Sequence, residues 1–219
     1  MLNLYCIPGM GVDERLFRNL KPKNCVLHHI KWETPFKNES LPEYALRLAK
    51  QIDTSIPFAL LGVSFGGMCA VEITKHLHPV KTFVISSCKT KDELPLKLTI
   101  WKYLPLYKSL SDDTYKRFAL IFKRQFGVNT KEQTEKFKDM LDASPKNYFR
   151  GAVHCIMSWK NKIVPENVIH IHGTADKVIS KDKVKANYLI EGGSHFMIIN
   201  RAKEINEIID EELKEYTQE

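Results

Sequence analysis

A serine set between two glycines is the sequence feature that points most directly to chemistry. Gly62-Val63-Ser64-Phe65-Gly66 matches the pattern G-x-S-x-G, after an apolar run over 57–63 and before a helical pattern over 66–77. Small residues two positions before and after the serine permit a very tight turn between a strand and a helix. Such a turn presents the hydroxyl at the carboxyl edge of a sheet, where a helix N-terminus favours developing negative charge. We therefore predict that Ser64 is a nucleophile.

A serine hydroxyl becomes a good nucleophile only when a base removes its proton, and histidine suits this role near neutral pH. Of the eight histidines, His195 has the most suitable position. It lies in Gly192-Gly193-Ser194-His195-Phe196, a glycine-containing loop between the last strand-like segment and the final helical one. His28, His29, His170 and His172 lie in or beside predicted strands, where packed or exposed side chains are expected.

The base needs an acid that fixes its tautomer and stabilises the imidazolium. Asp176 follows the predicted strand over 167–172, so it should lie at the same sheet edge as Ser64. A plain turn or helix-capping role is the alternative for this residue. Asp182 is the second candidate for the acid.

Acyl transfer also needs two backbone N–H groups that stabilise an oxyanion. Phe65, directly after the serine, is expected to supply one. Met10, in the loop Ile7-Pro8-Gly9-Met10-Gly11 after the first strand, is expected to supply the other, although this loop alone could be a simple strand-ending turn.

These residues require a sheet whose strands end at one edge. Hydrophobic patterns alternate along the chain between short apolar runs and helical stripes. This alternation favours an α/β fold with a mainly parallel sheet covered by helices on both faces. The predicted strands are 2–7, 25–30, 57–63, 80–86, 167–172 and 186–190. The predicted helices outside the middle segment, 89–162, are 42–52, 66–77 and 201–216.

The segment over 89–162 interrupts the alternation. It contains helical stretches such as 115–122 and holds 11 aromatic residues, 16 basic residues and 8 acidic residues. We interpret it as a helical insertion into a core formed by 1–88 and 163–219. Its positive charge is typical of a solvated helical surface, or would attract an anionic substrate or partner. Its aromatic residues either pack the insertion against the sheet or face a ligand. The candidates for substrate contact are Trp101, Tyr103, Phe118, Phe122 and Trp159.

Taken together, the segments 7–11, 62–67, 172–179 and 192–196 resemble the α/β-hydrolase superfamily, in particular its small, soluble, esterase-like branch. The resemblance implies an α/β-hydrolase fold in which the insertion is a helical cap over the active site. This chain departs from the family pattern at Pro8 and Val63, where the family often has histidine, although neither side chain is essential to a triad. The two antiparallel strands that usually open the sheet are missing, so about six strands are expected.

The expected function is that of a serine hydrolase acting on carboxylic esters of small or medium apolar groups through an acyl-enzyme. A thioesterase acting on an acidic carrier or coenzyme-linked acyl group, and a non-catalytic binding protein on the same scaffold, are the alternatives. The 219-residue composition excludes general disorder, and five scattered cysteines indicate a reduced, cytoplasmic protein. No metal or organic cofactor, nucleic acid or membrane partner is expected, and the oligomeric state, including a homodimer, stays open.

Overall fold

The computed structural model describes residues 1–95 and 109–217. Six strands form one sheet with the order β2-β1-β3-β4-β5-β6, and every pairing between neighbours is parallel. The strands are β1 (Leu2–Ile7), β2 (Cys25–His29), β3 (Phe58–Val63), β4 (Thr82–Ile85), β5 (Val168–Gly173) and β6 (Tyr188–Ile190). This sheet confirms the predicted architecture and the reduced number of strands.

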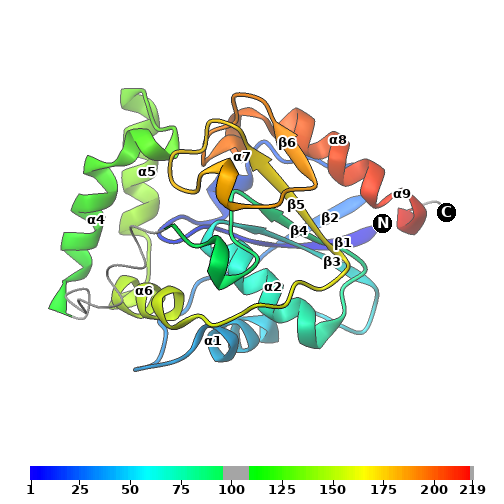
Figure 1. The fold of residues 1–219 in the computed structure, drawn as a ribbon, viewed down its shortest axis with the longest axis horizontal. Coiled ribbons are helices and arrows are strands. Elements are labelled where there is room, and N and C mark those ends of the chain that lie inside the picture. The colour runs from blue at the N-terminus through cyan, green and yellow to red at the C-terminus, as the bar shows by residue number, and fades with distance from the viewer. Residues whose placement is uncertain (96–108, 218–219) are drawn as a thin grey trace.

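Helices cover both faces of the sheet, so the central strands are buried. Helices α1 and α2 lie on one face, and α7 and α8 lie on the other (Figure 1). The core helices are α1 (Leu41–Leu48), α2 (Phe65–Leu77), α7 (Met197–Asn200), α8 (Ala202–Glu212) and α9 (Lys214–Thr217). Short 3₁₀ helices are η1 (Glu14–Phe17), η2 (Ala49–Gln51), η3 (Lys91–Glu93) and η6 (Lys181–Lys183).

Local sequence explains how the central elements form. All six residues of β3 are buried, as expected for a strand that is covered on both faces. A capping box starts α1, because the Ser40 side chain accepts from the Glu43 amide while the Glu43 carboxylate accepts from the Ser40 amide. The predicted helix over 42–52 is wrong in its last part, since α1 gives way to η2 and Ile52 is extended.

The middle segment contributes the helices α4 (Asp112–Ile121), η5 (Lys123–Phe126), α5 (Lys131–Asp142) and α6 (Tyr148–Ser158). The larger helices of this group gather at one end of the molecule, opposite the two chain termini (Figure 1). Strand β1 begins beside the N-terminus, so the carboxyl ends of the parallel strands face these helices (Figure 1). The helices therefore lie over the sheet edge at which Ser64 was predicted.

Within residues 1–95 and 109–217, no helix is long and apolar enough to cross a bilayer. The five cysteines are free thiols, four of them buried.

Candidate active site

Ser64 occupies a strained turn between β3 and α2. Its backbone has φ 52° and ψ −119°, outside the conformations that non-glycine residues normally adopt. The turn is this tight because its flanking residues lack side chains: a Cβ on Gly62 would lie 2.3 Å from the Gly66 oxygen, and one on Gly66 would lie 2.2 Å from the Ile7 oxygen. The sequence pattern predicted the tight turn between strand and helix, and the structure shows in addition that Gly66 lets the loop after β1 come close to it.

His195 links the serine to an acid through both of its ring nitrogens. Its Nε2 lies 3.0 Å from Ser64 Oγ, and its Nδ1 lies 2.8 Å from Asp176 Oδ2. An ionised carboxylate only accepts hydrogen bonds, so Nδ1 carries the proton and Nε2 presents a lone pair to the serine hydroxyl. Both His195 and Asp176 are buried, at 1% and 6% exposure. The structure thus brings together the three side chains that sequence placed in three separate loops.

Asp176 is held in its ionised form despite its burial. Burial raises the pKa of this carboxyl, but the charge of His195, the His195 hydrogen bond and the Ile179 amide together hold the pKa below its usual value. Its Oδ1 accepts hydrogen bonds from the amides of Val178 and Ile179, at 2.8 and 2.9 Å, which leaves Oδ2 for the imidazole. The carboxylate is therefore fixed in position by its own loop before it contacts His195.

Two other residues near this loop have different roles. His172 donates from Nε2 to the Ile179 carbonyl oxygen, 3.0 Å away, so it ties the end of β5 to the loop that holds Asp176. Burial lowers the pKa of His172, which keeps it neutral. Asp182, the second candidate for the acid, is exposed in η6, and its side chain meets Ser180 rather than His195.

Met10 and Phe65 both line the cavity that contains Ser64 and His195. Phe65 is the first residue of α2, so its amide has no acceptor within the helix. Met10 lies in the loop after β1, and no acceptor for its amide is found among the described residues. Both expected oxyanion donors thus lie beside Ser64, and neither N–H group has an acceptor in the part of the chain that the structure describes.

Trp32 contacts both the loop that carries the Met10 amide and the side chain of Phe65. Its Nε1 donates to the carbonyl oxygens of Gly9 and Val12, at 3.1 and 3.0 Å. Its ring stacks on Phe65, with centroids 5.3 Å apart, and also on Tyr44. The sequence analysis missed this residue, because an isolated tryptophan after a strand carries no pattern that distinguishes it from core packing.

The cavity above Ser64 has a volume of about 280 Å³ and is mainly apolar. The core contributes Ser64, Met10, the Asp176 loop and the His195 loop, and the middle segment contributes α4, η5, α5 and α6. No lysine, arginine, aspartate or glutamate lines it among the described residues. The charged side chains of the middle segment in 89–95 and 109–162 therefore lie outside the lining of this cavity.

The five predicted substrate contacts have different outcomes. Phe118 and Phe122 line the cavity and are 43% and 49% exposed, so they lie near its mouth. Trp101 and Tyr103 lie outside the described residues. Trp159 does not line the cavity: it is 2% exposed, and its Nε1 donates to the buried Glu72 carboxylate at 2.7 Å. That prediction is wrong, because this indole anchors the end of α6 to α2.

The sequence analysis missed most of the cavity wall. Its members from α6 are Phe149, Val153, Ile156 and Met157, which recur at helical spacing on one face. That spacing was a usable signal for a buried helix face. Further lining residues are Met68, Phe126, Phe137, Leu141, Val178, Ile179 and Phe196.

A backbone hydrogen bond ties the middle segment to the histidine loop. The Phe196 amide donates to the Phe126 carbonyl oxygen at 3.0 Å, and the Phe126 ring lies 5.7 Å from the His195 ring.

Within the described residues, no group of three or more histidine, cysteine or acidic side chains could hold a metal ion.

Comparison with known proteins gives a match in structure alone. No protein-family model and no curated protein matches the sequence. An esterase from Thermogutta terrifontis, solved with malate bound, superposes with a TM-score of 0.73 at 12% identity, covering 100% of this chain and 91% of that chain. YbtT, a type II thioesterase of the yersiniabactin pathway, gives a TM-score of 0.68 at 16% identity, over 99% and 94% of the two chains.

The chain has the α/β-hydrolase fold. A hydrolase from Pseudomonas aeruginosa supports the same conclusion, with a TM-score of 0.71 at 11% identity over 97% of this chain and 89% of that chain. In this α/β-hydrolase fold the serine turn follows β3, the acid follows β5 and the histidine follows β6, which is the chain order Ser, Asp, His.

Proposed function

We propose that this protein is a serine hydrolase that cleaves carboxylic esters or thioesters of apolar acyl groups through an acyl-enzyme. One observation carries the proposal: Ser64, His195 and Asp176 form a hydrogen-bonded chain of 3.0 and 2.8 Å that opens into an apolar cavity. The similarity in fold to esterases and a thioesterase supports it.

In the first half of the reaction, Ser64 Oγ attacks the acyl carbonyl carbon while His195 Nε2 takes the hydroxyl proton. The carbonyl oxygen becomes an oxyanion, which accepts hydrogen bonds from the amides of Met10 and Phe65. The tetrahedral intermediate then breaks its bond to the alcohol or thiol leaving group. His195 gives its proton to that group, and the acyl chain stays bound to Ser64.

In the second half, a water molecule loses its proton to His195 and attacks the same carbonyl carbon. The bond to Ser64 breaks, the serine recovers its proton from His195, and the carboxylic acid leaves as a carboxylate. Asp176 stays ionised throughout and stabilises the imidazolium that forms twice. The middle segment, acting as a helical cap over 89–162, excludes bulk water and shapes the acyl site.

Covalent labelling tests this function directly. A fluorophosphonate probe should modify the wild-type protein at Ser64, and Ser64→Ala should abolish both labelling and ester hydrolysis while the fold is retained. Equal labelling of the Ser64→Ala protein would remove Ser64 from the role of nucleophile. Failure of the wild-type protein to react with the probe or with any ester would favour a non-catalytic binding protein on this scaffold.

A thioester substrate is the second candidate. The fold similarity to a type II thioesterase and the basic character of the middle segment favour it. The kcat/KM values for an acyl ester and for the thioester of the same acyl chain distinguish the two candidates. If the thioester value increases selectively when an acidic carrier bears the acyl group, the carrier-directed thioesterase is supported.

A further inference from the structure

A second recess lies on the other side of the cavity wall from Ser64. It is lined by residues from η1, the start and body of α5, and the segment that runs from the histidine loop into α7. Phe137 and Phe196 line both this recess and the cavity above Ser64, so the two spaces share these rings as a wall. The lining also includes Ser194, the neighbour of His195 in the chain.

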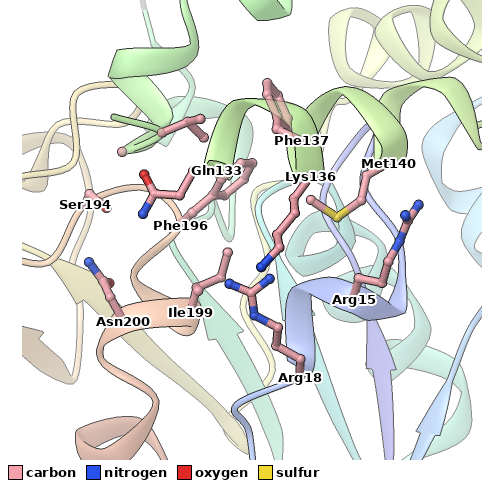
Figure 2. Close-up of a pocket in the computed structure, with 12 residues that line it drawn as sticks. Arg15, Arg18, Gln133, Lys136, Phe137, Met140, Ser194, Phe196, Ile199 and Asn200 are labelled. Carbon is pink, nitrogen blue, oxygen red and sulfur yellow. The ribbon is translucent and has the colours of Figure 1, made fainter. Parts of the chain in front are cut away.

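All charged residues in the lining of this recess are cations: Arg15, Arg18 and Lys136. Figure 2 shows the Arg18 and Lys136 side chains pointing toward one another at the mouth, while Arg15 points away. Arg15 is neutralised by Asp13, to which it donates through Nε and Nη2. Among the described residues, the Arg18 side chain has no hydrogen-bond or ion-pair partner.

The remaining counter-charge at the mouth is weakly held. Lys136 pairs with Glu132 one helical turn earlier, but these side chains are 48% and 76% exposed. Exposed pairs of this kind are weak, because water screens them, so another anion can compete for Lys136. Arg18 and Lys136 thus converge at the mouth, where the exposed Glu132 carboxylate interacts with both of them.

The recess is polar at its other end and apolar at its floor. The Gln133 side chain accepts from the amides of Asn129 and Thr130 through Oε1, which leaves its Nε2 free to donate. Ser194 and Asn200 lie at the same end (Figure 2). The apolar side chains of the lining, here called its floor, are Val128, Phe137, Met140, Phe196 and Ile199. This combination suits a ligand with a charged head and a short apolar body.

The size of the recess limits that ligand. Its volume is about 50 Å³. A water-sized atom needs roughly 10–15 Å³, so about three to five atoms fit below the mouth. We propose that this recess binds a small amphipathic oxyanion: a carboxylate or phosphate head between Arg18 and Lys136, and an apolar tail of a few carbons against Phe137 and Phe196. This binding does not depend on the chemistry at Ser64.

Calorimetric titration of the full chain with sodium butyrate, sodium acetate, butyl phosphate and inorganic phosphate tests the proposal. We expect saturable one-to-one binding of butyrate and butyl phosphate. Each should bind more tightly than its counterpart without the tail, by up to about fourfold per methylene that reaches the floor. The ratio between butyrate and butyl phosphate tells which head is preferred. Inorganic phosphate that binds as tightly as butyl phosphate would overturn the amphipathic assignment.

Variants locate the binding site. Arg18→Ala combined with Lys136→Ala should weaken butyrate binding by about tenfold or more, and Glu132→Gln should strengthen it several-fold, because the competing carboxylate is lost. Lys181→Ala combined with Lys183→Ala removes the same charge from exposed positions in η6 and should leave binding unchanged. All of these side chains are exposed, so the variants should fold. Absence of saturable binding, or equal weakening by the two double variants, would overturn the proposal.

Discussion

The indole N–H of Trp32 fixes the peptide plane that carries the Met10 amide. It donates to the Gly9 carbonyl oxygen at 3.1 Å. In a trans peptide the C=O and the following N–H point in opposite directions. Because the Gly9 oxygen is held toward Trp32, the Met10 N–H points away from Trp32. The same ring stacks on Phe65, so one side chain supports both proposed oxyanion donors.

Trp32→Phe tests this support. The variant keeps an aromatic ring against Phe65 but loses both hydrogen bonds to the loop. We expect kcat to fall by about tenfold to a hundredfold with little change in KM, because the oxyanion forms only after binding. The matched control is Tyr44→Phe, which removes a hydrogen bond to Glu33 in the same aromatic cluster without touching the loop. Both variants should lose about 1–2 kcal/mol of stability, but kcat should fall only in the first.

The strain at Ser64 predicts a difference between two inactive variants. Ser64→Ala keeps a Cβ at φ 52°, whereas Ser64→Gly removes it. Relief of strain at such a position is worth about 1–3 kcal/mol, and the extra freedom of glycine in the unfolded chain offsets part of it. The glycine variant should therefore be more stable than the alanine variant by about 1 kcal/mol in urea denaturation. Equal stabilities would mean that the strain relieved at Ser64 is no larger than the entropic cost of the glycine.

Replacing the two candidate acids separates their roles. Asp176→Asn should lower kcat by about 10²–10⁴-fold, because the amide no longer fixes the imidazole tautomer that presents a lone pair to Ser64. Asp182→Asn should leave kcat close to the wild-type value, since this side chain contacts Ser180 at the surface. Steady-state kinetics of the two variants provide the measurement. A reversed outcome would assign the acid to Asp182.

His170 predicts how stability depends on pH. Its ring is buried in β5, neither ring nitrogen has a hydrogen-bond partner among the described residues, and burial holds its pKa well below the usual value. The unfolded chain therefore binds a proton that the folded chain excludes. The resulting stability is present above the unfolded pKa of about 6.5 and is lost as pH falls through the window below it. Urea denaturation measured at intervals of about one pH unit between pH 8 and pH 4 should show this loss of stability.

His170→Leu supplies the control for this pH dependence. Leucine has a similar size and no titratable group, so the variant should lose less stability than the wild-type protein on acidification. Burial also lowers the pKa of His172 and of His29, and the pKa of Asp176 is lowered too, so these groups add slope in the same direction in both proteins. Parallel pH profiles of the variant and the wild-type protein would rule out His170 as a source of the acid sensitivity.

The cavity wall predicts the preferred acyl chain length. For p-nitrophenyl esters, kcat/KM should rise about threefold to fourfold per added carbon until the cavity is full. Val153→Phe should shift this limit to shorter chains, because Val153 lines the cavity from α6. Trp159→Phe should lower stability by about 1–3 kcal/mol, because Glu72 Oε1 loses its hydrogen-bond donor while Oε2 keeps its ion pair with Lys75, but it should leave the chain-length limit unchanged. A flat profile would show that the aromatic residues serve packing alone.

Salt should have the same small effect on neutral and anionic esters at the catalytic cavity. Its lining holds no charged side chain from the basic middle segment within the described residues.

Local sequence patterns could predict the sheet and the serine turn, because a buried strand, small residues and a helix are adjacent in the chain. Asp176 and His195 were found because parallel strands end at a common edge.

The residues that sequence reasoning missed depend on tertiary packing. Trp32 acts through carbonyl groups of a loop 20 residues or more away, and no local pattern marks that contact. Trp159 was predicted as a substrate contact because it is aromatic, but its partner Glu72 lies 87 residues earlier in the chain. Aromatic content can indicate that a segment must bury apolar surface, but it does not specify which surface covers each ring.

The hydrogen bond from the Phe196 amide to the Phe126 carbonyl oxygen couples the middle segment to the alignment of His195 with Ser64. Phe196 follows His195 directly in the chain. A rigid-body lift of the helical segment at η5 must therefore either break this bond or pull the imidazole away from Ser64. Substrate entry that preserves the alignment has to pivot about this point. A cap transplanted from another protein would consequently disturb turnover as well as specificity, unless it restored an acceptor at this position.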